Sequence, residues 1–70
     1  MIGKVKFWNS DKGYGFVIGN DGKEYYTHAT FNQPKGKMLY QRECEFESRT
    51  NEKKIYERNA GREAHNIIQD

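Results

Sequence analysis

The sequence contains no window in which apolar residues recur at the helical spacing i, i+3, i+4 and i+7. β-Branched, aromatic and alternating apolar residues instead form short segments, and clusters of Gly, Asn, Asp and Ser separate these segments. This pattern predicts a single all-β domain over residues 1–70, and short strands divided by turns favour a small closed or partly open barrel. The five expected strands lie at residues 3–9, 14–18, 24–28, 43–48 and 64–68.

Turn signals mark the connections between these strands. Residues 21–22, Asp-Gly, supply a position that tolerates positive φ, so the strands on either side are expected to form a hairpin. Residues 32–37 contain the only proline of the chain and are expected to be a loop. The connection at 49–59 is longer, and Ile55-Tyr56 is expected to extend a hairpin within it.

Residues 14–18 place two kinds of side chain on opposite faces of the expected strand. Tyr14 and Phe16 project from one face, whereas Gly15 and Val17 project from the other. Hydrophobic residues are only 34% of the chain, so apolar side chains must either build one core or line a functional surface. An arbitrary aromatic pair at this spacing more often belongs to a core. This chain offers a core without the pair, made of Val5, Val17, Cys44, Phe46 and Ile67.

Aromatic rings interleaved with lysines indicate the functional surface. Residues 12–17, Lys-Gly-Tyr-Gly-Phe-Val, match the first six positions of the ribonucleoprotein octapeptide, with Gly19 in place of its final aromatic residue. Rings two residues apart on a strand are separated by about 6–7 Å, which suits neighbouring unstacked bases. Further rings and cations stand on neighbouring segments, namely Phe7, Trp8 and Tyr26 among Lys4, Lys6 and Lys12. The pattern predicts a stacking surface for single-stranded nucleic acid beside an electropositive groove.

Four segments resemble the cold-shock domain family. Residues 3–9, Gly-Lys-Val-Lys-Phe-Trp-Asn, are similar to its Gly-x-Val-Lys-Trp-Phe-Asn, and residues 12–17 match its first nucleic-acid motif. Residues 23–28, Lys-Glu-Tyr-Tyr-Thr-His, resemble its second motif, Lys-Asp-Val-Phe-Val-His, and residues 64–67, Ala-His-Asn-Ile, resemble its closing Ala-x-Asn-Val. The octapeptide is shared with the RNA-recognition-motif fold, but that fold places it after a strand and a helix, whereas here it begins at residue 12.

The resemblance implies a five-stranded antiparallel OB-fold barrel that binds single-stranded RNA or DNA with low sequence specificity. The implied role is that of an RNA chaperone or a regulator of transcription or translation. Carried over by position, the contact residues are Lys6, Phe7, Trp8, Lys12, Tyr14, Phe16, Tyr26 and His28. Phe31 is a further candidate, because Ala29 replaces an aromatic residue that follows the histidine in the family.

Two departures from the family pattern concern the site and the core. Phe7-Trp8 inverts the family's Trp-Phe order, which leaves open which ring does most of the stacking. Simple alternation puts these two rings on opposite faces, so both reach one ligand only if the strand bulges or twists there. Tyr25 and Thr27 replace two valines of the family's core, which implies a rearranged or less tightly packed interior.

Other function classes find little support in the sequence. Cys44 has no second cysteine to pair with, and two histidines give no zinc-binding spacing. No carboxylate cluster or nucleophile–base pair accompanies the aromatic motif, so we expect no catalysis, cofactor, metal or small-molecule substrate. The apolar runs are far shorter than the roughly 20 residues that span a bilayer, and no leader opens the chain. We therefore expect a soluble, cytoplasmic protein without a membrane partner.

The connection at 49–59 leaves two interpretations open. Its cations Lys53, Lys54 and Arg58 form either a second basic contact surface or the solvated face of a hairpin. The net charge of +2 is weak evidence for a polyanionic partner. The competing function is a protein-interaction module that uses an exposed strand edge or this connection, and it predicts no response to oligonucleotides.

Overall fold

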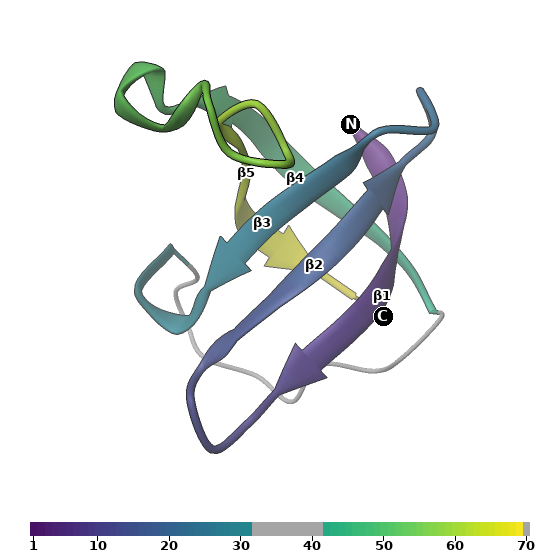
Figure 1. The fold of residues 1–70 in the computed structure, drawn as a ribbon. Helices are drawn as coiled ribbons and strands as arrows, with labels where there is room; N and C mark the ends of the chain where they lie inside the picture. The colour runs from purple at the N-terminus through teal and green to yellow at the C-terminus, as the bar shows by residue number, and fades with distance from the viewer. Residues whose placement is uncertain (32–41, 70) are drawn as a thin grey trace.

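The computed structural model describes residues 1–31 and 42–69 as a closed barrel of strands, with β1, β2 and β3 facing the viewer in Figure 1 and β4 and β5 behind them. Its strands are β1 (Ile2–Asn9), β2 (Tyr14–Gly19), β3 (Glu24–His28), β4 (Glu43–Thr50) and β5 (Arg62–Ile68). Two short 3₁₀ turns, η1 (Ala29–Phe31) and η2 (Glu52–Lys54), complete the described elements. The predicted all-β barrel is confirmed, and the expected loop at 32–37 lies outside the described residues.

The order of strands around the barrel is β1-β2-β3-β5-β4, and β4 returns to pair with β1. Every pairing is antiparallel except that of β3 with β5, which is parallel and is formed at Tyr26 and Glu63. The resemblance implies an antiparallel barrel, and the parallel β3–β5 pairing is the one departure from it among the described strands. No helix in the part of the chain that the structure describes is long and apolar enough to cross a membrane.

The core lies inside the barrel and contains four of the five residues expected there. Its buried hydrophobic members are Val5, Val17, Tyr25, Cys44, Phe46 and Ala64. Ile67, which was expected among them, is only partly buried and packs against this cluster. Tyr25 fits because its ring packs 5.2 Å from that of Phe46 while its hydroxyl donates a 2.7 Å hydrogen bond to Asp21. This bond keeps the pKa of the Asp21 carboxyl below its ordinary value.

A β-bulge in β1 decides where its two large rings lie. Val5 is opposite Val17, but Phe7 is opposite Phe16, so Lys6 is an extra residue without a partner position on β2. After this extra residue, the alternation of inward and outward side chains is shifted by one position. Phe7 therefore lies on the same outer face as Phe16, and Trp8 points inward.

Burial controls the chemistry of the single thiol. Cys44 is 2% exposed, and this burial raises the pKa of its thiol to about 11. The thiolate is the reactive form, so a pKa raised by two units lowers the thiolate fraction roughly a hundredfold. We expect a disulfide reagent at neutral pH to label native Cys44 far more slowly than Cys44 in urea. Equal rates in the two conditions would contradict this burial.

The connection between β4 and β5 is not the extended hairpin expected from Ile55-Tyr56. Asn51 caps η2 by accepting a hydrogen bond from the Lys53 amide at 3.1 Å, and a series of turns follows. A 2.7 Å bond from the Asn51 amide to the Gly61 carbonyl closes the segment into a compact loop. Ile55 and Tyr56 therefore lie in turns rather than in a strand, and both are exposed.

Candidate nucleic-acid interface

A continuous set of aromatic rings covers the outer face of β1, β2 and β3. Phe7 and Tyr14 have ring centres 5.9 Å apart, Tyr14 and Phe16 6.4 Å, and Phe16 and Tyr26 5.9 Å. Tyr14 and Tyr26 lie 6.4 Å apart with nearly parallel planes, at 27°. We call this surface, with two further rings, the ring platform; its members are Phe7, Tyr14, Phe16, Tyr26, His28 and Phe31.

Period-2 alternation in β2 and β3 produces this face. Tyr14 and Phe16 are half-buried, whereas Gly15 and Val17 between and after them are buried. A Cβ atom at Gly15 would overlap the carbonyl oxygen of Phe7 and lie 2.8 Å from Cε3 of Trp8. The missing side chain thus lets β1 and the Trp8 ring pack closely beneath the platform.

The position of Trp8 differs from the expectation that it lies on the platform. It is opposite Gly15 in the β1–β2 pairing, and its half-buried ring packs against the core. Phe7 takes the exposed position, with 37% of its surface accessible. The inverted Phe-Trp order therefore gives the smaller ring to the platform and the larger one to its support.

Phe31, the further contact candidate, extends the platform beyond β3. The η1 turn brings its ring 6.0 Å from that of Tyr26 and 5.9 Å from that of His28. His65 of β5 stacks on Phe31 with ring centres 4.1 Å apart and planes 14° apart. Residue spacing gives no signal for His65 as a neighbour of these rings, because only the barrel's strand order brings β5 beside β3.

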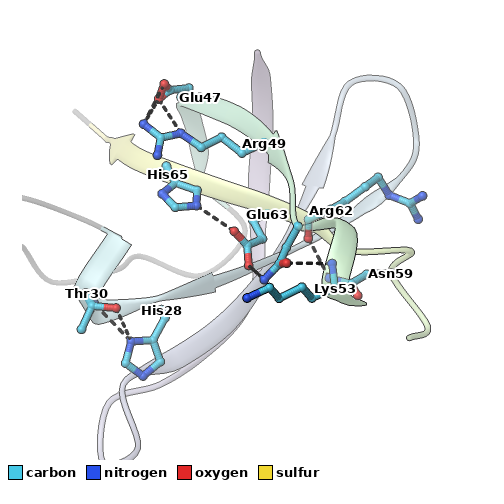
Figure 2. Close-up of polar contacts among 10 residues, drawn as sticks. His28, Thr30, Glu47, Arg49, Lys53, Asn59, Arg62, Glu63 and His65 are labelled. Atoms are coloured by element: carbon cyan, nitrogen blue, oxygen red, sulfur yellow. Dashed lines mark hydrogen bonds and ion pairs between the residues drawn. The ribbon is translucent and has the colours of Figure 1, made fainter. Parts of the chain in front are cut away.

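Hydrogen bonds fix both imidazoles. Nδ1 of His28 accepts the Thr30 amide at 3.1 Å, so in the neutral ring Nε2 carries the proton (Figure 2). Nε2 of His65 lies 3.0 Å from the Glu63 carboxylate, which is itself buried (Figure 2). Glu63 in turn accepts a long bond of 3.5 Å from the Asn51 side chain at the start of the connection.

Cations stand around the platform at different positions. Nζ of Lys6, the bulged residue, is 3.1 Å from Glu24. Lys12 is exposed in the β1–β2 turn, where its amide bonds to Asn9 at 3.0 Å. From the β4–β5 connection, Nζ of Lys54 lies over the Tyr26 ring, 5.5 Å from its centre. Burial, followed by the nearby charges of the acidic residues, raises the pKa of the Tyr26 hydroxyl.

The structure thus brings together most of the side chains that the sequence singled out. Six rings form the ring platform, and Lys6 and Lys12 flank it, whereas Trp8 lies below it. An extended face of rings can stack unpaired bases, and cations at its margin can approach the phosphates between those bases. Contact of each residue with nucleic acid stays a prediction.

Comparison with known proteins gives relatives of one kind. No protein-family model matches the chain. The chain is 37% identical over 68 residues to Cold shock protein CspB of Bacillus caldolyticus, and the alignment covers 94% of this chain and 92% of the relative. CspB of Geobacillus stearothermophilus gives the same values. Cold shock protein 1 of Lactiplantibacillus plantarum is 47% identical over 34 residues, and there the alignment spans about half of each protein, 49% of this chain and 52% of the relative.

Proposed function

The chain belongs to the cold-shock protein family, and from this premise we propose that it binds single-stranded RNA or DNA by stacking bases on the ring platform. The observation that carries the proposal is the unbroken series of rings from Phe7 to Phe31 on one face. Every base has a face that can stack on an aromatic ring, so such a surface is tolerant of sequence. The protein acts as a binding module that keeps strands unpaired, as an RNA chaperone or a regulator of transcription or translation does.

Binding involves two kinds of contact, ring to base and lysine to phosphate. The rings hold the bases, with His28 stacking on a base or donating a hydrogen bond to it. Lys6 and Lys12 approach the phosphates, although Lys6 must share its charge with Glu24. Trp8 supports the platform from below by packing against the core.

A direct titration tests the proposal. We expect a short fluorescently labelled oligothymidylate to bind at micromolar protein concentration, with a rise in fluorescence anisotropy. A duplex of the same length should bind more weakly, because its bases are already stacked on each other. A flat titration with single-stranded DNA and RNA would overturn the proposal and favour the competing protein-interaction module.

The salt dependence of this binding is expected to be shallow. Lys6 and Lys12, with up to two further contacts from Lys4 and Lys23, neutralise about two to four phosphates, so log affinity against log salt should slope by roughly −1.5 to −3. Replacing Lys12 with alanine should flatten the slope by about 0.7, because one phosphate contact is lost. Lys53→Ala, on the connection, is the matched control.

Two results would change this account. A slope steeper than about −5 would mean that Lys53, Lys54 and Arg58 also hold the strand. A slope that Lys12→Ala leaves unchanged would remove Lys12 from the interface.

A further inference from the structure

Beside the ring platform, the β4–β5 connection forms one wall of a pocket of about 250 Å³. In Figure 1 the connection is drawn in green, above β3. Phe16 and Tyr26 contribute aromatic surface to the pocket. Its charged lining residues are Glu24, Glu57 and Glu63 together with Lys54 and Arg58. Drug-sized ligands occupy pockets of about 300–1,000 Å³, so this smaller pocket suits a single flat base.

The three carboxylates differ in what already binds them. Glu24 lies 3.1 Å from Lys6 and 3.7 Å from Arg58. Glu63 is bound by His65 and Asn51, as described above. The exposed Glu57 carboxylate has no hydrogen bond or ion pair with any residue in the described ranges. Glu57 and Tyr26 line the same pocket. Glu57 is therefore the carboxylate with both oxygens open to a ligand.

The charges of the lining select among the bases. A carboxylate only accepts hydrogen bonds, and two parallel donors match its two oxygens. Guanine has such a pair in N1–H and the N2 amino group. Adenine and cytosine offer one amino group beside an acceptor nitrogen, and thymine and uracil place N3–H between two carbonyl oxygens that a carboxylate repels. The pocket thus favours guanine and disfavours thymine and uracil.

We propose that this pocket is a subsite for one guanine of the bound strand, in which Tyr26 and Phe16 contact the base and Glu57 accepts hydrogen bonds from N1–H and the N2 amino group. Lys54 and Arg58 supply the positive charge of the pocket lining. The subsite rests on the proposed function and adds to it a preference at one position of an otherwise sequence-tolerant surface. The subsite also explains the length of the connection, because residues 54–61 supply most of the pocket wall.

The test compares oligothymidylate with otherwise identical strands that carry one guanine at each position in turn. We expect one position at which guanine tightens binding by about 5- to 150-fold, the range of a bidentate base contact. Hypoxanthine at that position, which lacks the N2 amino group, should lose most of this gain. Glu57→Gln should abolish the guanine preference, because an amide presents one acceptor and one donor. Glu52→Gln, an equal charge change on the same connection outside the pocket, should keep the preference.

The possible failures are distinguishable. Equal affinity for strands with and without guanine, or a preference that survives in Glu57→Gln, would overturn the subsite while oligothymidylate binding upholds the proposed function. A uniform gain for every strand in Glu57→Gln would also overturn the subsite, since it would show that the carboxylate only repels phosphate. Absence of binding to any strand by the unaltered protein would overturn the proposed function itself.

Discussion

Replacing Phe46 with alanine is expected to lower the free energy of unfolding by about 3–5 kcal/mol, the usual cost of deleting a buried aromatic ring. Phe46 is 3% exposed and packs against Tyr25 in the centre of the barrel. A domain of this length has a total stability of about 3.5–10 kcal/mol, so this loss is a large part of the whole. Urea denaturation followed by Trp8 fluorescence measures the change, because Trp8 packs against the same core. A loss below about 1 kcal/mol would show that Phe46 does not hold the core together.

Replacing Phe16 with alanine is expected to weaken single-strand binding by about 1–3 kcal/mol, or about 5- to 150-fold in Kd. The reason is the loss of one base–aromatic stack at the centre of the ring platform. Tyr14→Ala should have an effect of the same size. Anisotropy titrations of the same labelled oligothymidylate against each variant give the measurement.

The two phenylalanine variants serve as controls for each other. Phe16 touches Tyr14 and Tyr26 edge-on, and such contacts are worth only about 0.5–1.5 kcal/mol to the fold, so Phe16→Ala should stay folded. The folded fraction of Phe46→Ala, in contrast, should bind with normal affinity. If Phe16→Ala unfolded as readily as Phe46→Ala and its folded fraction bound normally, the Phe16 ring would belong to the core.

The strands and their faces were accessible from sequence because alternation is a local signal. The segment 24–28 coincides with β3, and the opposite placement of Tyr14 and Phe16 against Gly15 and Val17 is confirmed. The sequence predicts that Phe7 and Trp8 reach one ligand only if β1 bulges. The bulge exists, but it turns Phe7 outward and Trp8 inward instead of placing both rings on the outer face. The direction of such a reset depends on pairing with β2, which no local pattern contains.

The features that the sequence does not predict depend on tertiary contacts. Ile55-Tyr56 has the composition of a strand, but the cap at Asn51 and the bond to Gly61 hold the connection in turns. His65 reaches Phe31 only because β5 lies beside β3. The pocket formed with Glu57 likewise needs the connection folded against the barrel. Each of these features depends on segments that are distant along the chain, so residue spacing does not report it.

The parallel pairing of β3 with β5 predicts how binding changes the local stability of the barrel. One bridged pair, Tyr26 with Glu63, joins these strands among the described residues, and the Arg62 guanidinium adds a 3.1 Å bond to the Glu24 carbonyl. Because so few backbone bonds connect β3 and β5, we expect the barrel to open most easily between these two strands in local fluctuations. The ring of the same Tyr26 belongs to the ring platform, between those of Phe16 and Phe31. We expect a base stacked on Tyr26 to oppose this opening, so amide hydrogen exchange in β3 and β5 should slow when nucleic acid binds.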